Sequence, residues 1–209
     1  MIKIRNVKKT IKNETVLNNI NLEFEKGFIY GLAGRNGSGK TMLLRAICGL
    51  IIPTEGSIEI NGLFLHKDMS FSPNTGIIIE NMQMTPQLSG FENLKALSKI
   101  KKIANEEDID SALKRVGLEN EKSQKVKKYS LGMKQKLNIA QAILEKPDLL
   151  LLDEPLNAID QEGVERIREL LIEEKERGCI VIIASHLTED LNRLCDKKII
   201  LDKGEVING

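Results

Sequence analysis

Hydrophobic and polar residues alternate in the first thirty positions, and this pattern predicts antiparallel β-structure. Ile2 and Ile4 are separated by charged residues, and a second alternating stretch follows a polar turn at residues 12–14. Two further hairpins are expected, one centred on Asn61-Gly62, a dipeptide that favours two-residue β-turns, and one over residues 199–207. The N-terminal stretches therefore indicate a small antiparallel sheet.

Three wholly apolar runs, residues 28–33, 149–152 and 179–184, predict strands of a different kind. A strand with apolar residues on both faces suits the interior of a parallel sheet covered by helices on both sides. An apolar, helix-forming run at residues 42–48 and an amphipathic helical pattern at residues 162–177 each end at a glycine, which is typical of a helix C-terminus. These elements indicate an α/β fold.

From about residue 77 the pattern changes to one dominated by helices. After the apolar run 77–79, helical periodicity predicts helices over residues 92–101, 106–116 and 130–145. Ser89 lies three residues before Glu92, the spacing of a capping box, and Ser130 is a suitable N-cap for the last helix. The middle of the chain is therefore expected to be mainly helical.

The composition is that of an ordinary globular protein, with 209 residues, 41% hydrophobic and 29% charged. The net charge of +1 offers no overall field for nucleic acid or an anionic membrane, and the basic stretch 122–128 is interpreted as a solvated surface. No signal-peptide pattern or membrane-spanning run is found, so we expect a cytoplasmic chain. Three scattered cysteines are expected to be reduced, buried thiols, and His66 a surface residue.

The spacing G-x-x-x-x-G-K-[ST], found between a predicted strand and a predicted helix, indicates a loop that wraps a polyphosphate. Glycines allow backbone N–H groups to approach phosphate closely. Lys40 is expected to reach the β- and γ-phosphate oxygens, and the Thr41 hydroxyl to ligate Mg²⁺. The predicted nucleotide contacts in this region are Gly34, Arg35, Asn36, Gly37, Ser38, Gly39, Lys40, Thr41 and Met42.

Polar residues that follow two of the apolar runs are the candidates for catalysis. Asp153 and Glu154 come directly after residues 149–152, at the strand end where open α/β sheets bind ligands. We expect Asp153 to hold Mg²⁺ and Glu154 to orient the water that attacks the γ-phosphate. His186 ends another strand and is expected to donate a hydrogen bond to the γ-phosphate.

The order and spacing of these motifs resemble the ATP-binding subunit of ABC transporters over essentially the whole chain. Gly34 to Thr41 match the phosphate loop, residues 149–154 the Mg²⁺ strand with its catalytic glutamate, and His186 the switch histidine. Residues 157–160 resemble the D-loop and 129–133 the signature sequence. The resemblance implies one P-loop NTPase domain over 1–209: a RecA-like core with an antiparallel β subdomain (1–76 and 147–209) and an inserted helical subdomain (77–146).

The resemblance also implies how such a subunit works. Two subunits pack head to tail as a homodimer or with a paralogous subunit, so that ATP on one phosphate loop is covered by the signature helix of the other. The residues expected to contact the nucleotide across this interface are Ser130, Leu131, Gly132, Met133 and Asp160. Hydrolysis would drive a separate integral-membrane permease, which holds the subunit at the inner face of the cell membrane, and no nucleic acid is expected as a partner.

Two departures from the family pattern affect the expected site. Glu80 stands where the family usually has glutamine, and it is assigned to the metal environment, where a second carboxylate should raise the dependence on Mg²⁺. Bacitracin-type and lantibiotic-immunity exporter subunits are similar in this glutamate and in the signature. Ile11 aligns with the adenine-stacking aromatic, so apolar contact from Ile11 and Val16, with loose base selectivity, is expected.

The leading hypothesis is the ATPase subunit of an exporter for a peptide, antibiotic-like or hydrophobic compound, with the permease contacting residues 80–94. A soluble ABC-type ATPase acting on DNA or the ribosome is the alternative. Such proteins usually carry a coiled-coil insertion or two linked nucleotide domains, and neither pattern is found. A nucleotide-binding regulator without turnover is a third hypothesis, against which Glu154 and His186 argue.

Overall fold

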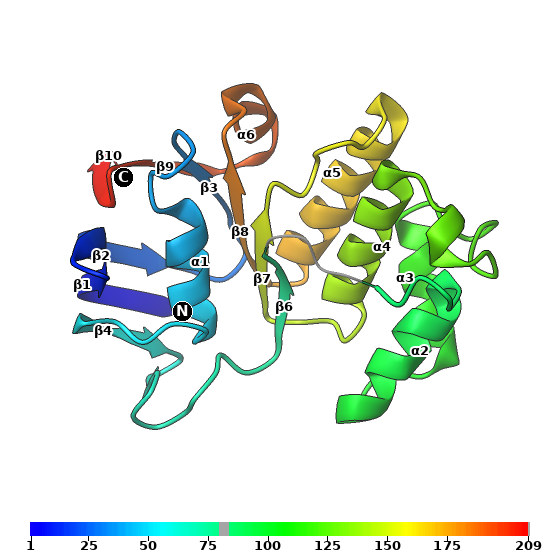
Figure 1. The fold of residues 1–209 in the computed structure, drawn as a ribbon, viewed down its shortest axis with the longest axis horizontal. Coiled ribbons are helices and arrows are strands. Elements are labelled where there is room, and N and C mark those ends of the chain that lie inside the picture. The colour runs from blue at the N-terminus through cyan, green and yellow to red at the C-terminus, as the bar shows by residue number, and fades with distance from the viewer. Residues whose placement is uncertain (80–83, 209) are drawn as a thin grey trace.

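The computed structural model describes residues 1–79 and 84–208, which contain an antiparallel β-sheet at one end of the fold and a central β-sheet between it and a group of helices (Figure 1). The antiparallel sheet has the order β2-β1-β4-β5 and the central sheet the order β10-β9-β3-β8-β7-β6. Glu80 and the first residues of the expected permease contact, 80–83, lie outside the described ranges. The α/β fold predicted from the apolar runs is confirmed.

The strands of the antiparallel sheet are β1 (Ile2–Ile11), β2 (Glu14–Phe24), β4 (Glu55–Ile60) and β5 (Leu63–Phe64). Those of the central sheet are β3 (Ile29–Ala33), β6 (Thr75–Ile78), β7 (Leu149–Asp153), β8 (Ile180–Ser185), β9 (Lys197–Asp202) and β10 (Glu205–Asn208). The helices are α1 (Lys40–Cys48), α2 (Gly90–Lys101), α3 (Glu106–Arg115), α4 (Leu131–Ile143), α5 (Gln161–Glu176) and α6 (Thr188–Leu194), with a short 3-10 turn η1 (Val126–Lys128).

The three predicted hairpins are confirmed, and local backbone chemistry explains them. Each turn has two central residues at positive φ: Lys12 and Asn13, Asn61 and Gly62, and Lys203 and Gly204. Two consecutive left-handed residues make the turn whose twist matches that of paired antiparallel strands. The hairpins β1–β2, β4–β5 and β9–β10 are therefore encoded within a few residues of sequence.

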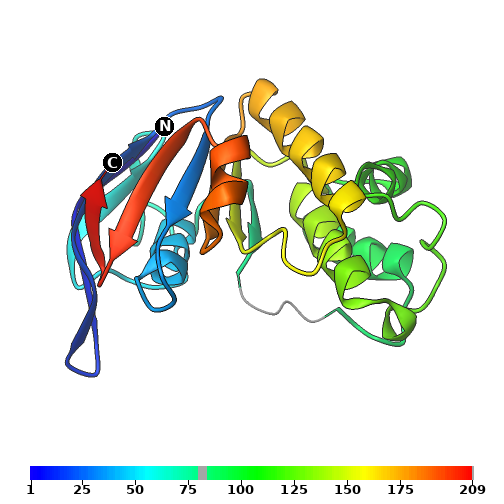
Figure 2. The same cartoon turned by 90° about the horizontal axis from the view of Figure 1, so that it is seen from above.

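The central sheet is covered on both faces, as its apolar strands predict. β7 lies between β6 and β8, parallel to both. Leu149 and Leu151 belong to the core cluster that includes α1 and the antiparallel sheet, whereas Leu150 and Leu152 belong to the cluster that includes α4 and α5. Figure 2 shows these helices on opposite sides of the sheet, with both chain termini near the antiparallel sheet.

Helices α2, α3 and α4 gather on one side of the sheet (Figure 1). The predicted capping box of α2 is confirmed: the Ser89 N–H donates to Glu92 Oε2 at 2.7 Å, and the Glu92 N–H donates to Ser89 Oγ at 3.1 Å. Ser130 caps α4 by accepting from the Met133 N–H at 3.1 Å. Residues 77 and 78 lie in β6 of the central sheet, and one hydrophobic cluster joins the three helices directly to that sheet.

Some details of the sequence prediction need correction. Helix α6 was not predicted, because its sequence is short and mostly polar. His66, expected at the surface, is half-buried, with Nε2 3.3 Å from the Ile51 carbonyl oxygen. The three cysteines are free thiols as expected, and burial raises the pKa of Cys179 and of Cys195 to about 12. Among the described residues, none of the helices combines the length and apolar character needed to cross a bilayer.

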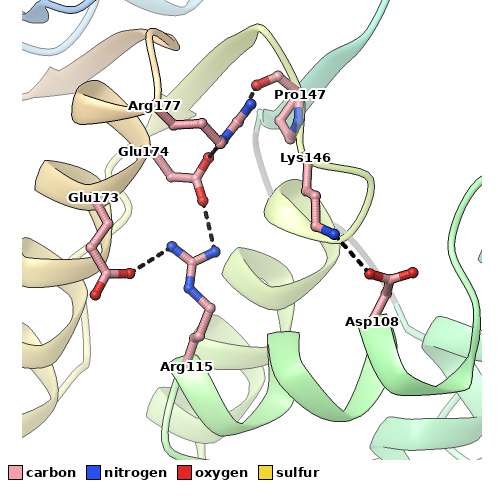
Figure 3. A network of polar contacts seen from close by, with 7 residues as sticks. All are labelled: Asp108, Arg115, Lys146, Pro147, Glu173, Glu174 and Arg177. Carbon is pink, nitrogen blue, oxygen red and sulfur yellow. Dashed lines mark hydrogen bonds and ion pairs between the residues drawn. The ribbon is translucent and has the colours of Figure 1, made fainter.

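A network of ion pairs and hydrogen bonds joins α3 to α5, and α5 to the segment before β7 (Figure 3). Arg115 donates to Glu173 at 2.9 Å and to Glu174 at 2.7 Å. The Glu174 side chain is only 3% exposed and also accepts a 2.6 Å bond from Arg177. A buried carboxylate must be compensated by nearby cations, so this network joins the helical region to the core.

Replacing Arg115 with methionine is expected to destabilise the protein by about 2–3 kcal/mol, because Glu174 would keep only one of its two cationic partners. The free energy of unfolding in urea measures this loss. Lys146→Met is the matched control, because Lys146 pairs with Asp108 at 3.0 Å but is 70% exposed, and such a surface pair contributes at most about 1 kcal/mol. Equal effects of the two substitutions would contradict the assigned role of Glu174.

Candidate functional site

Three strand ends meet at one edge of the central sheet. β3 leads into the glycine loop before α1, β7 ends at Asp153, and β8 ends at Ser185. The strand register sets Ala33 opposite Ser185 and Asp153 opposite Ala184, so all three ends lie side by side. The sequence-based prediction that these segments share one edge is confirmed.

The loop from Gly34 to Gly39 is closely packed beneath the strand ends. A Cβ on Gly34 would lie 2.4 Å from the Leu201 carbonyl oxygen, and Gly39 has a φ of 106°, which disfavours any other residue. The Ser38 carbonyl accepts from the Gly204 N–H at 2.9 Å. The loop therefore holds its shape through backbone contacts that only glycine permits at these two positions.

Lys40 brings a cation to this loop. The residue is buried, with 6% of its surface exposed. Its Nζ donates to the carbonyl oxygens of Gly34 at 2.6 Å and Arg35 at 3.1 Å. Ser38 Oγ is buried there without a hydrogen-bond partner among the described residues. An ammonium group, an unpaired hydroxyl and a helix N-terminus together make an anion site.

A cavity of about 500 Å³ opens beside the loop. Its lining residues are Glu14, Val16, Asn36, Gly37, Ser38, Gly39, Lys40, Thr41, Met42, Asp153 and Glu154. Most of these were predicted from the sequence; Glu14 was not, because a polar residue after a hairpin turn carries no special signal. Ile11, at the end of β1, is not among the lining residues, so its contact with a base stays a prediction.

Thr41 and Asp153 join the loop to β7. The Thr41 hydroxyl donates to Asp153 Oδ2 at 2.5 Å across 112 residues of sequence. Hydroxyl and carboxylate oxygens are ligands that suit Mg²⁺, which keeps several waters and binds together with substrate phosphates. Among the described residues, no group of three or more His, Cys, Asp or Glu could hold a metal. The Thr41 hydroxyl and the Asp153 carboxylate fit such a cation, whose remaining ligands would be phosphate oxygens and waters.

Glu154 and His186 are brought into direct contact. Glu154 Oε1 lies 2.7 Å from His186 Nδ1 and accepts from the His186 N–H at 2.9 Å, while Oε2 accepts from Ser185 Oγ at 3.1 Å. The sequence predicted that both residues lie at this edge of the sheet. It predicted neither their contact nor the hydrogen bond from Ser185 to Glu154. The strand register of β7 and β8 creates these contacts.

The predicted signature residues lie away from this cavity. None of Ser130, Leu131, Gly132 and Met133 lines it, and the Leu131 side chain at the start of α4 is 71% exposed. The helix instead contacts the segment after β7.

Two contacts join α4 to that segment. A Cβ on Gly132 would lie 2.5 Å from the Ala158 carbonyl oxygen, and Lys136 pairs with Asp160 at 2.9 Å. The hydrogen bond from Lys136 and its positive charge lower the pKa of Asp160. Within one subunit, the signature segment is thus placed beside the predicted D-loop and not over the phosphate loop.

Comparison with known proteins gives a consistent result. A family model described as ABC transporter matches residues 17–157. The uncharacterized ABC transporter ATP-binding protein YybJ of Bacillus subtilis is 61% identical over 206 residues, which cover 99% of this chain and 94% of YybJ. The bacitracin transport ATP-binding protein BcrA of Enterococcus faecalis is 37% identical, with 99% and 68% covered, and the lantibiotic transport ATP-binding protein SrtF of Streptococcus pyogenes is 36% identical, with 99% and 89% covered.

A solved structure extends the likeness to the fold. The dimeric post-hydrolysis state of the ATP-binding cassette MJ0796, bound to ADP and Pi, matches this chain with a TM-score of 0.89 at 27% identity. The match covers 100% of this chain and 97% of that structure.

Proposed function

Because the chain belongs to the ABC transporter family, as an ATP-binding subunit with ATPase activity, we propose that the sheet edge described above is its hydrolytic site. The observation that carries this assignment is the convergence of Lys40, the Thr41–Asp153 pair and Glu154 on one cavity. ATP hydrolysis by the wild-type chain, compared with that by the Glu154→Gln variant, tests it.

Each group has a distinct role in the proposed reaction. Lys40 and the loop N–H groups would bind the phosphates, and Thr41 and Asp153 would hold Mg²⁺, which would neutralise part of the phosphate charge. The Glu154 carboxylate orients a water and accepts its proton as the oxygen attacks the γ-phosphorus, so that ADP leaves. His186 is held by Glu154 where its ring can also donate to the γ-phosphate.

The proposed site is completed by a second subunit, in a homodimer or with a paralogous chain. The exposed start of α4 supports this, because Ser130 and Leu131 lie outside the cavity of their own chain. In a head-to-tail pair this helix N-terminus would face the γ-phosphate held by the other subunit. The core of each subunit (1–76 and 147–209) would then bind one ATP. The helical region (77–146) of each subunit would cover the ATP that is bound to the core of the other subunit.

We propose that the dimer drives a membrane permease that exports a peptide, antibiotic-like or hydrophobic compound. The similarity to BcrA, a bacitracin transport ATP-binding protein, and to SrtF, a lantibiotic transport ATP-binding protein, supports this proposal. Within residues 80–94, Met84 and Phe91 pack against the helical core while remaining partly exposed. Partly exposed apolar side chains suit a surface that contacts the permease. The subunit would then lie at the inner face of the cell membrane.

The Glu154→Gln form, trapped with ATP, provides a test of this partner. Affinity purification from detergent-extracted membranes is expected to recover an integral-membrane protein. Recovery of ribosomes or DNA instead would favour the alternative of an ATPase that acts on nucleic acid.

Glu80, which lies outside the described residues, is proposed to act near the metal. Glu80→Gln is expected to retain much of the ATPase rate but to lower the dependence on Mg²⁺, because one negative charge near the cation is removed. The measurement is a titration of Mg²⁺ at fixed ATP, together with transport by the assembled exporter. If the titration midpoint and transport both stay unchanged, Glu80 has no special part.

A further inference from the structure

Gln135 makes a contact that the assigned functions of the family motifs do not use. It lies near the start of α4, and its side-chain Nε2 donates to the carbonyl oxygen of Pro155 at 3.1 Å and to that of Glu154 at 3.3 Å. These two carbonyls belong to the catalytic glutamate and to the residue after it. One side chain of the helical region therefore holds the backbone on which the proposed base is mounted.

The backbone of Glu154 needs such support. Its φ of 49° lies in the left-handed region, which costs a residue with a side chain about 1 kcal/mol. On one side the Glu154 N–H donates to the Ala184 carbonyl at 2.9 Å. On the other side the two amide hydrogens of Gln135 face the two successive carbonyls. The left-handed conformation is thus held from β8 and from α4 together.

Other contacts keep α4 at a fixed distance from this segment. Gly132 packs so closely on the Ala158 carbonyl that no larger residue fits without a shift, and Lys136 pairs with Asp160. Gln135 thus lies between two other residues of α4, Gly132 and Lys136, that contact the same segment. We therefore expect a small displacement of α4 to shift the backbone of Glu154 through the hydrogen bonds of Gln135.

We propose that Gln135 is a positioning residue for ATP hydrolysis, which holds Glu154 in the conformation that directs its carboxylate toward Ser185 and His186. The proposal rests on the proposed function, in which Glu154 orients the attacking water. Since the N-terminus of the same helix would cover the nucleotide of the partner, Gln135 also makes the geometry of one active site depend on the occupancy of the other.

Three substitutions at this position separate positioning from packing. Gln135→Met removes the donors at similar length and is expected to lower kcat about tenfold, with KM and the Kd for ATP within about twofold. Gln135→Glu keeps the shape but presents only acceptors to the two carbonyls, so a larger loss of kcat is expected. Gln135→Lys restores an N–H donor and should recover most of the rate. Gln141→Met, on the same helix beside a separate cavity, is the matched control.

Wild-type and Glu154→Gln proteins are measured in the same assay, so the inference can fail while the proposed function stands. Wild-type kcat for Gln135→Met, or a loss that appears in KM and ATP affinity, overturns the positioning role. So does a further loss when Gln135→Met is added to Glu154→Gln, because residues that act through one group should not be additive. If Gln135→Met fails to fold by circular dichroism, Gln135→Lys carries the test, because it keeps a long side chain with an N–H donor, and a kcat far below that of the wild type then overturns the positioning role.

Discussion

Replacing Glu154 with glutamine is expected to lower the rate of ATP turnover at least about a hundredfold. An amide has the shape of the carboxylate but cannot accept the proton of the attacking water, and general base catalysis contributes about 10²–10⁴ in rate. ATP affinity should stay close to that of the wild type, because the groups proposed to bind phosphate are Lys40 and the glycine loop.

The measurement is kcat from phosphate release, with the Kd for ATP measured separately on each protein. Glu189→Gln, an exposed carboxylate three residues after His186, is a control that should leave both values unchanged. If the Glu154→Gln and wild-type proteins turn over ATP at equal rates, the sheet edge is not the hydrolytic site. A measurable rate in the wild type would then have to come from elsewhere.

Introducing glutamate at Leu131 is expected to lower the rate of hydrolysis about a hundredfold by a different route. The Leu131 side chain is 71% exposed in the single subunit, and a carboxylate at the first position of a helix is favourable, so folding and ATP binding should be unaffected. In the head-to-tail dimer the new carboxylate would meet the γ-phosphate of the partner's ATP, and like charges in a closed site repel strongly. The neutral Leu131→Gln variant is the matched control and should stay within a few-fold of wild type.

Mixing two inactive variants tests the head-to-tail arrangement directly. A Lys40→Met subunit lacks a working phosphate loop but keeps an intact Leu131, and a Leu131→Glu subunit has the opposite defect. A mixed dimer contains one site with both intact parts, so activity should reappear on mixing. Sedimentation in the presence of ATP should show that Leu131→Glu alone stays monomeric.

Two outcomes would argue against a shared site. If Leu131→Glu hydrolyses ATP at the wild-type rate, the start of α4 does not cover a nucleotide. If the mixture stays inactive although mixed dimers form, the loop and the signature residues of one site do not come from different subunits.

The local features of the fold were predictable because neighbouring residues determine them. Asn61-Gly62 fixes a hairpin through its left-handed backbone, and Ser89 with Glu92 fixes the start of α2. The apolar run at residues 149–152 predicts a strand buried on both faces. Helix α6 was not predicted because its sequence is short and mostly polar, and Leu191 and Leu194 pack it against the core.

The candidate site was predictable in its parts but not in its contacts. The glycine loop, Asp153, Glu154 and His186 were identified from motif spacing and from their places after apolar strands. The contact between His186 and Glu154 depends on the register of β7 with β8, and this register cannot be predicted from the sequences of the two strands. The position of the signature residues away from their own cavity depends likewise on how α4 packs against the sheet.

The sequence by itself determined which chemical groups are present and in what local order, because strand periodicity, turn chemistry and loop spacing act over a few residues. Only the tertiary structure decided which of these groups touch. Gln135 with Pro155, and Arg115 with Glu174 59 residues later, are joined by helix packing, and such long-range contacts arise from burial of the whole core rather than from any local pattern. The phosphate loop was therefore evident from the sequence, whereas the contacts that support Glu154, the proposed catalytic base, were not.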